Sequence, residues 1–268
     1  MAESVRDQAP EPGRSPPTAA EFDDGFAAAA ASAGLRQVWQ IADPDLPAEI
    51  EPFSFVSAAL LGHLALALAL SPGQTLVDLG CGRGGPGLWL ARQAQASLVG
   101  VDFSPVAVAL AGQRAAVFGL AGRARFVVGE LTDTRLPDAG ADAVVCIDAM
   151  HFAADLTRAA REAFRILAAG GRLVLTNWQP RVPGDPQLPA QRRDTDWART
   201  LGEAGFAEVA VDARPEWHDY FTHIYRIALS RGDPGQDTAL AALQDEARQR
   251  LPTADLLHRV VVTATRPR

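Results

Sequence analysis

Short apolar runs alternate with longer amphipathic segments through the middle of this chain. Five runs have the length of buried strands: residues 75–79, 98–101, 125–129, 143–147 and 172–176. The segments between them repeat apolar residues at helical spacing, and the clearest such stripe consists of Leu156, Ala160, Ala163, Phe164 and Leu167. Ser104 and Pro105 predict the start of the helix after the second strand, with Val106, Leu110 and Val117 on one face. Strands that alternate with helices in this way predict an α/β fold with a doubly wound, mostly parallel sheet and right-handed crossovers.

The pattern differs before the first strand. Residues 1–20 are rich in Pro, Glu and Ser and have no apolar core of a signal peptide, so we expect a disordered tail. Residues 21–33 are dominated by Ala and predict a helix. Residues 53–70 predict a second helix, which is strongly apolar but too short to span a bilayer. Residues 21–70 are therefore interpreted as N-terminal helices that pack on the sheet.

The pattern also changes after the fifth strand. A Pro-rich loop at residues 179–189 precedes a helix that extends to about residue 204, and residues 206–211 predict a sixth strand. Two helical segments at residues 215–256 then separate this strand from the last one, residues 259–265. Because no crossover helix of its own leads to the last strand, that strand can enter the sheet antiparallel. We expect residues 21–268 to form one domain, in which residues 215–256 are a cap over the ligand-binding edge.

A glycine-rich turn follows the first strand. Gly80, Gly82 and Gly85 match the dinucleotide pattern G-x-G-x-x-G, which is a weak signal by itself. Glycines allow positive φ and leave no Cβ between the backbone and a ligand, and the N–H groups of the following helix favour a polar or anionic group. Asp78 and Gly84 extend the pattern to Asp-x-Gly-x-Gly-x-Gly. A carboxylate at the mouth of the turn suits a ligand that carries a cation.

Acidic residues also follow the second and third strands. Asp102 ends the second strand, 20 residues after Gly82, where an acid can accept hydrogen bonds from both ribose hydroxyls of a nucleotide cofactor. Phe103 would then lie against the adenine. Glu130 and Leu131 could pair with the adenine through the carboxylate and the Leu131 backbone N–H. The alternative for Glu130 is a solvated loop position.

Composition excludes several functions. The chain has 268 residues, 48% of them hydrophobic, and a net charge of −7; all 25 basic residues are Arg. An acidic chain is a poor match for a nucleic acid, whose phosphates need a basic face. No Cys or His spacing indicates a metal site, and two cysteines predict reduced thiols in a cytoplasmic protein rather than a disulfide. The expected partner is therefore a small molecule, without nucleic acid or membrane.

Residues 75–178 resemble the core of class I S-adenosylmethionine-dependent methyltransferases, specifically the small-molecule branch of bacterial secondary metabolism. The motifs are VDLGCGRGG (77–85), VGVDFSP (99–105), GEL (129–131), DAVVCIDAMHF (142–152) and REAFRILAAGGRLVLTNW (161–178). The resemblance implies seven strands in the order 3-2-1-4-5-7-6 with the last one antiparallel. It also implies S-adenosylmethionine at the carboxyl edge, with Asp148 after the fourth strand among the cofactor-binding residues, and an acceptor covered by the cap and the N-terminal helices.

His151 matches a histidine that resembles the general base of related sugar and phenol O-methyltransferases. A neutral imidazole near pH 7 suits that role, although His151 could instead only hydrogen-bond a loop. Some relatives place a carboxylate after the fifth strand as partner of the base, and here that position is Asn177, which leaves a His–Asp dyad in doubt. His218 and His223 are further candidates for the base.

Aromatic residues outside these motifs predict a flat or apolar acceptor. Trp39, Phe55, Trp178 and Tyr220 are the candidate substrate contacts. Trp217, Phe221 and Tyr225 recur at i, i+4 and i+8 on one helical face, which fits either core packing or a pocket wall.

The sequence favours S-adenosylmethionine-dependent methylation of a small, largely apolar natural product, most readily at oxygen. One alternative is a cyclase of the same fold that binds S-adenosylmethionine without transferring its methyl group. A second is an NAD-dependent oxidoreductase, which Asp78 and the lack of any lysine disfavour. A third is a non-catalytic module that binds the cofactor only for structure. The oligomeric state stays open, with a homodimer as one option.

Overall fold

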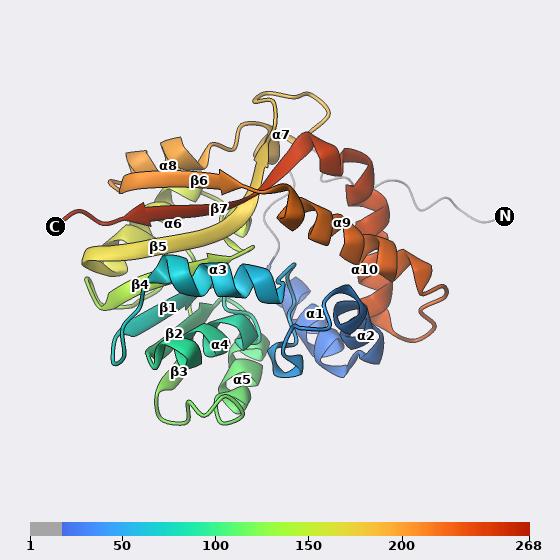
Figure 1. Ribbon diagram of the computed structural model, residues 1–268, viewed down its shortest axis with the longest axis horizontal. Helices are drawn as coiled ribbons and strands as arrows, with labels where there is room; N and C mark the ends of the chain where they lie inside the picture. The colour runs from blue at the N-terminus through green and yellow to red at the C-terminus, as the bar shows by residue number, and fades with distance from the viewer. Residues whose placement is uncertain (1–17) are drawn as a thin grey trace.

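A seven-stranded sheet in the order β3-β2-β1-β4-β5-β7-β6 forms the centre of the molecule (Figure 1). The computed structural model describes residues 18–268, except for the side chains of residues 190 and 191. The strands are β1 (Thr75–Leu79), β2 (Ser97–Asp102), β3 (Ala124–Val128), β4 (Ala141–Ile147), β5 (Leu167–Pro180), β6 (Ala207–Ala213) and β7 (Leu257–Thr265). Strand β7 pairs antiparallel with both β5 and β6, and the remaining pairs are parallel. The predicted fold class, strand order and antiparallel last strand are confirmed.

Helices cover both faces of the sheet and one of its ends. They are α1 (Ala19–Ala31), α2 (Ala33–Ala42), η1 (Ala48–Ile50), α3 (Ala58–Leu68), α4 (Gly85–Ala94), α5 (Pro105–Arg114), η2 (Met150–Phe152), α6 (Leu156–Ile166), α7 (Ala190–Arg193), α8 (Trp197–Glu203), α9 (Pro215–Ser230), α10 (Thr238–Arg250) and η3 (Leu251–Leu256). Helices α3 and α4 pack their leucines on one face of the sheet, and α6 and α8 bury their apolar stripes on the other. Each strand of the centre is therefore apolar on both sides.

The burial of α3 explains its unusually apolar sequence. Leu60, Leu61 and Leu64 are at most 1% exposed and pack against the β1–β4–β5 region of the sheet. Burying a leucine side chain contributes about 1.5–3 kcal/mol to folding. A helix of this length is only marginally stable by itself, so the burial of these three leucines accounts for most of its stability. Ser57 begins the helix by accepting a hydrogen bond from the Leu60 N–H at 3.1 Å.

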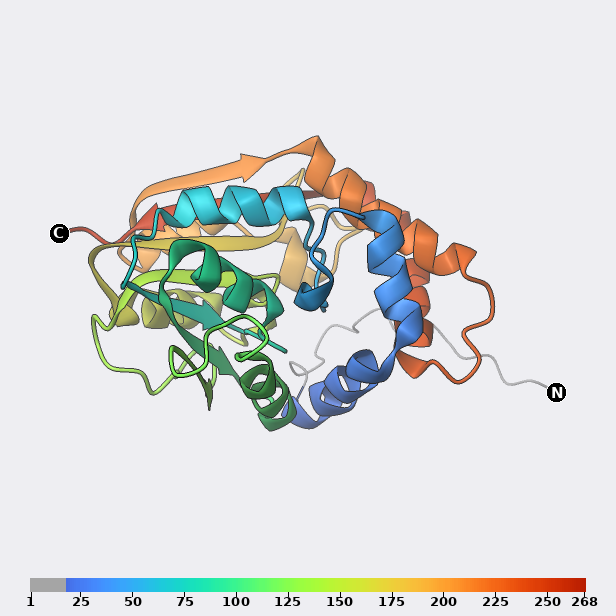
Figure 2. The ribbon, with the colours of Figure 1, turned by 60° about the horizontal axis from the view of Figure 1, so that its bottom comes forward.

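Four helices gather beyond the carboxyl ends of the parallel strands. Helices α1 and α2 lie against α10 and α9, although nearly 200 residues separate the two pairs in sequence. Figure 2 shows α1 and α2 as an arch between α5 and the α9–α10 pair. Asp237 joins the two pairs: its carboxylate accepts hydrogen bonds from Ser32 Oγ at 2.7 Å, Gly34 N at 3.0 Å and Leu240 N at 3.0 Å. The predicted two-helix insertion before the last strand is confirmed.

Several predicted boundaries were wrong. Residues 1–17 of the predicted tail lie outside the described residues, but Thr18 caps α1, which already begins at Ala19. Strand β5 starts at Leu167, which pairs with Ala141 of β4, and it continues to Pro180, because nine consecutive residues from Arg172 onward pair with β7. The single helix expected up to residue 204 is two short helices, α7 and α8.

Helix α5 has its predicted start but a different buried face. Ser104 Oγ accepts from the Ala107 N–H at 3.0 Å, and Pro105 occupies the first turn, as expected. The buried face is formed by Ala107 and Ala111, whereas Val117 is 67% exposed. Small alanines let this helix approach the neighbouring elements closely, whereas the prediction relied on large apolar residues.

Within residues 18–268, no helix combines the length and the apolar character needed to cross a bilayer.

Candidate cofactor and acceptor site

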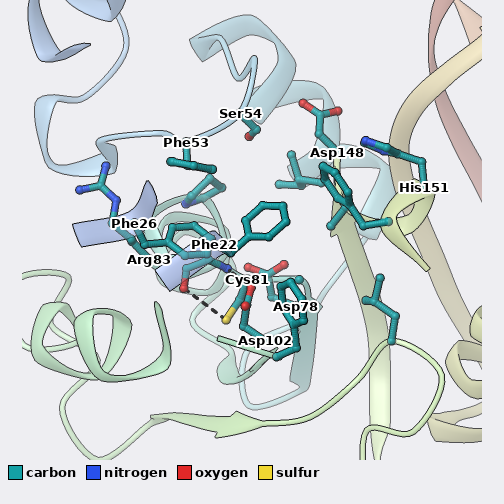
Figure 3. A pocket seen from close by; sticks show the side chains of 18 of the residues that line it. Phe22, Phe26, Phe53, Ser54, Asp78, Cys81, Arg83, Asp102, Asp148 and His151 are labelled. Carbon is teal, nitrogen blue, oxygen red and sulfur yellow. Dashed lines mark hydrogen bonds between the residues drawn. The ribbon is translucent and has the colours of Figure 1, made fainter. Parts of the chain in front are cut away.

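A cavity of about 760 Å³ opens at the carboxyl edge of the sheet (Figure 3). The glycine turn after β1 and the residues that follow β2, β3 and β4 form one side of it. Helix α1 and the loop before α3 cover it, and the cap helices α9 and α10 close its far end. Figure 3 shows Asp78 and Asp102 on one side of this space and Asp148 and His151 on the other.

The glycine turn has the positive φ angles that its sequence predicts. Gly80, Gly82 and Gly84 all line the cavity and have φ of +69°, +50° and +77°, a region that disfavours other residues. The Gly80 and Cys81 N–H groups donate to the Val101 carbonyl at 2.8 and 3.0 Å, which ties the turn to β2. A Cβ on Gly80 would lie 2.3 Å from the Cβ of Ala149. A glycine is therefore needed at this position because the loop that contains Ala149 lies so close, whether or not a ligand binds.

Asp78 is a buried carboxylate without a protein partner. Its side chain lines the cavity, the residue is 2% exposed, and it makes no hydrogen bond or ion pair with the residues that the structure describes. Burial and, to a smaller extent, the nearby Asp102 carboxylate raise the pKa of Asp78 to about 7. A cationic ligand group would stabilise the ionised form, so the position fits the charge expected from the sequence.

Asp102 is held in place by backbone N–H groups. Gly82 N donates to one carboxylate oxygen at 2.8 Å and Ser104 N to the other at 3.0 Å. Burial raises the pKa of Asp102, these two hydrogen bonds lower it, and Asp23 of α1 raises it. Each carboxylate oxygen keeps a second lone pair, so both can still accept from a ligand hydroxyl.

The residues predicted to contact an adenine are also at the cavity. Phe103, Glu130 and Leu131 line it. Glu130 is exposed, and its backbone forms an isolated bridge with Asp133. The Phe103 ring is 5.3 Å from that of Phe22, so α1 covers this part of the site.

Asp148, predicted as a cofactor-binding residue, also bonds to three protein groups. It lines the cavity, but its carboxylate accepts from Thr176 Oγ1 at 2.6 Å, from an Arg259 guanidinium nitrogen at 2.7 Å and from Phe55 N at 3.3 Å. Arg259 is 2% exposed and also donates to the Phe55 carbonyl. These bonds fasten the loop before α3 to the sheet, and the contact of Asp148 with the cofactor stays a prediction.

The acceptor residues divide into two groups. Trp39, Phe55 and Trp178 line the cavity, and the Phe55 and Trp178 rings lie 5.9 Å apart in an edge-to-face arrangement. Tyr220 is absent from the lining; its hydroxyl donates to the Val56 carbonyl at 3.1 Å. The prediction for Tyr220 is therefore corrected: this residue supports the loop before α3 and does not face the cavity.

His151 is half-buried in the cavity wall after β4. Its ring lies 5.8 Å from Trp178 and 4.1 Å from Phe152, and it makes no hydrogen bond with a described residue. Burial holds the pKa of His151 well below 6.5, and the positive charges of Arg192 and Arg250 lower it further. Asn177 uses its Oδ1 to accept from Trp178 N at 2.9 Å, and it does not line the cavity. Therefore, no carboxylate among residues 18–268 orients the His151 imidazole.

The cavity residues from helices α1, α7 and α10 were not predicted from the sequence. Phe22 and Phe26 of α1 project into the cavity, and their i, i+4 spacing was a signal that the alanine-rich context obscured. Of the aromatic stripe on α9, Phe221 and Tyr225 line the cavity, whereas Trp217 packs with α3. Arg192, Glu246 and Arg250 also line the cavity, and no motif marked them.

These features define a class of protein. A glycine turn after β1, a free carboxylate beside it and an acid at the end of β2 are arranged for a nucleotide-type cofactor with a cationic group. A second, aromatic part of the same cavity adjoins this place. The sheet order with an antiparallel β7 separates this fold from the all-parallel dinucleotide-binding sheets.

Comparison with known proteins identifies a methyltransferase domain within the chain. Residues 77–175 match a family model described as a methyltransferase domain. The chain is 30% identical over 170 residues to 27-O-demethylrifamycin SV methyltransferase of Amycolatopsis mediterranei, covering 63% of this chain and 59% of that protein. Residues 77–175 are therefore a methyltransferase domain, and the chain as a whole resembles small-molecule methyltransferases.

Solved structures share the fold. The [4+2]-cyclase SpnF superimposes with a TM-score of 0.68 and 27% identity, covering 78% of this chain and 80% of that one. Phosphoethanolamine N-methyltransferase 2 of Haemonchus contortus, solved with S-adenosyl-L-methionine, has a TM-score of 0.70 and 18% identity and covers 92% and 57% of the two chains. The chain spans less than two thirds of the length of the curated relatives it matches.

Proposed function

We propose that this protein transfers a methyl group from S-adenosylmethionine to an oxygen of a small, largely apolar acceptor. The observation that carries the proposal is that one cavity contains both the Asp78 carboxylate and His151. A cofactor that occupies the glycine turn and an acceptor that contacts His151 would therefore share one enclosed space.

The cofactor half fits S-adenosylmethionine by charge and by shape. Asp78 would face the cationic part, Asp102 would accept from the ribose hydroxyls, and Phe103, Glu130 and Leu131 would surround the adenine. Gly80, Gly82 and Gly84 would allow close approach of the backbone. The unpartnered Asp78 supports this assignment, because a buried carboxylate without a partner is costly unless a ligand completes it.

The acceptor half fits an apolar body with a hydroxyl. Trp39, Phe55 and Trp178 offer flat apolar surfaces, and His151 would take the hydroxyl proton as the acceptor oxygen forms its new bond to carbon. Bound S-adenosylmethionine supplies the electrophilic methyl group. A depressed pKa keeps the imidazole neutral near pH 7, so it is able to accept a proton. General base catalysis contributes roughly 10²–10⁴-fold, and alignment of the reactants contributes the rest.

A calorimetric titration with S-adenosylhomocysteine, and separately with NAD, tests the cofactor half. We expect micromolar binding of the first and none of the second. The reverse result would contradict the proposal and indicate an NAD-dependent oxidoreductase. Once an acceptor is found, His151→Ala should lower turnover by roughly 10²–10⁴-fold while sparing S-adenosylhomocysteine affinity. Wild-type turnover in this variant would remove His151 as the base.

A second candidate function is cyclisation without methyl transfer. The likeness to the [4+2]-cyclase SpnF favours it, together with Asn177 in place of an ionisable partner for His151. The mass of the product separates the two functions, since methylation adds one methylene unit and cyclisation adds none.

A further inference from the structure

Two arginines line the acceptor end of the cavity in a chain whose net charge is −7. Arg192 belongs to the short helix α7, and Arg250 is the last residue of α10. They meet there with Trp178, Tyr225 and the carboxylate of Glu246. The helices come from different parts of the chain, so this cluster exists only in the folded protein.

The Arg192 guanidinium makes no hydrogen bond or ion pair with any residue that the structure describes. It lies 5.8 Å from the centroid of the Trp178 ring, and the Glu246 carboxylate acts on it only as a nearby charge. Burial and the positive charge of Arg250 together lower the pKa of Arg192 to about 10. Arg192 thus remains a cation at neutral pH in a place that penalises an unpaired charge.

Arg250 is only loosely neutralised. Its Nε lies 3.9 Å from the Glu246 Oε1, beyond hydrogen-bond distance. One carboxylate therefore faces two guanidinium groups at this end. The opposite end of the cavity holds the carboxylates of Asp78 and Asp102. The cavity is acidic where the cofactor is expected and basic where the acceptor is expected.

We infer that the acceptor carries an anionic group, a carboxylate or a phosphate, which Arg192 and Arg250 bind while its apolar body contacts Trp178 and Phe55. This inference rests on the proposed function, because it names the chemistry of the acceptor of that site. Guanidinium groups suit both anions, since their N–H donors match two oxygens at once. An anion at this place would also offset the two positive charges that lower the pKa of His151, and so strengthen the base when the acceptor is bound.

Binding of three probes with the same alkyl chain tests the inference: octanoate, octyl phosphate and 1-octanol. Each is titrated by calorimetry into protein saturated with S-adenosylhomocysteine, which leaves the acceptor end free. We expect at least one anion to bind 10-fold or more tightly than the alcohol. A preference between the two anions tells whether the group is a carboxylate or a phosphate.

Variants locate the effect. Arg192→Gln and Arg250→Gln should each weaken binding of the preferred anion by roughly 10- to 100-fold and leave 1-octanol unchanged. Arg248→Gln is the matched control: it removes the same charge from α10, but Arg248 is exposed and pairs with Asp245. Wild-type affinity for S-adenosylhomocysteine in all three variants shows that the cavity is folded.

The outcomes separate the inference from the proposed function. Failure of S-adenosylhomocysteine to bind the wild type contradicts the proposed function. Normal binding of it, with no binding of either anion or with equal affinity for 1-octanol, overturns the inference alone. An effect of Arg248→Gln as large as that of Arg250→Gln also overturns it, because the anion would then respond to overall charge. The comparison of probes in the wild type stands even if a variant does not fold.

Discussion

The two ends of the cavity are built in different ways. At the cofactor end, consecutive residues at the ends of β1 and β2 provide the turn, and backbone N–H groups hold Asp102. At the acceptor end, side chains from α2, the loop before α3, β5, α7, α9 and α10 meet across the sheet edge. The first end is a local motif, and the second is an assembly of distant segments. A short motif therefore predicts the cofactor, whereas the proposed acceptor contacts depend on how the cap packs.

One buried ion pair links the two ends. Arg259 of β7 holds both the Asp148 carboxylate and the Phe55 carbonyl, so the loop that carries an acceptor contact is fastened to the end of β4. The exposed fractions of these two side chains are 1% and 4%. Changes at this pair and at each end should show whether the ends are independent.

The largest effect is expected for Asp148→Ala. It would leave the Arg259 guanidinium buried and unpaired, which costs about 3–5 kcal/mol of unfolding free energy. Urea denaturation measures the loss. Asp245→Ala is the control, because it breaks an exposed pair with Arg248 that contributes about 0–1 kcal/mol. Equal losses in the two variants would refute the structural role of the buried pair.

Gly80→Ala should disturb the cofactor end alone. The alanine would have to adopt φ near +69° and would bring its Cβ 2.3 Å from Ala149, a strain of about 1–3 kcal/mol or more. We expect at least 10-fold weaker S-adenosylhomocysteine binding by calorimetry. Gly112→Ala in α5 is the control, since its Cβ meets nothing within 4 Å and alanine favours a helix. Unchanged affinity in Gly80→Ala would mean that the turn tolerates a side chain.

Asp78→Asn should weaken binding of S-adenosylhomocysteine, which carries an ammonium group, by about 1.5–3 kcal/mol. The wild type should bind it more tightly as the pH rises through about 7, because Asp78 ionises there. In the absence of ligand, the folding stability changes with pH in the opposite direction to the affinity. The pKa of Asp78 in the folded protein exceeds the ordinary 3.8, so this group lowers stability as the pH rises from about 4 to 7. Affinity in the Asn variant that still rises with pH over this range would exclude Asp78 as the titrating group.

The smallest effect is expected for Tyr220→Phe. It removes one hydrogen bond to the Val56 carbonyl, worth about 0.5–1.5 kcal/mol of stability, and leaves the cavity wall intact. Thermal unfolding should report this loss while the affinities for S-adenosylhomocysteine and octyl phosphate stay at wild-type values. Tyr225→Phe is the comparison, because Tyr225 does line the cavity. A changed ligand affinity in Tyr220→Phe alone would restore Tyr220 as a ligand contact.

Much of the fold followed from local rules. The alternation of apolar runs with amphipathic segments predicted the parallel strands, and Ser104 with Pro105 predicted the start of α5. Boundaries were wrong where pairing between distant strands decided them: β5 extends through Trp178 because β7 lies beside it. The buried face of α5 was wrong because its alanines pack where larger residues would not fit.

The sequence by itself predicted the place of the cofactor end. Its residues follow β1, β2 and β3, and the carboxyl ends of parallel strands lie at one edge of the sheet, so the strand pattern brought them together. Only the tertiary structure decided what the acceptor end contains. Tyr220 and Tyr225 belong to the same helix, yet one supports a loop and the other lines the cavity. Arg192 and Arg250 are 58 positions apart and meet only because α7 and α10 pack over the same edge of the sheet. Such contacts depend on burial and charge in three dimensions, which residue spacing along the chain does not encode.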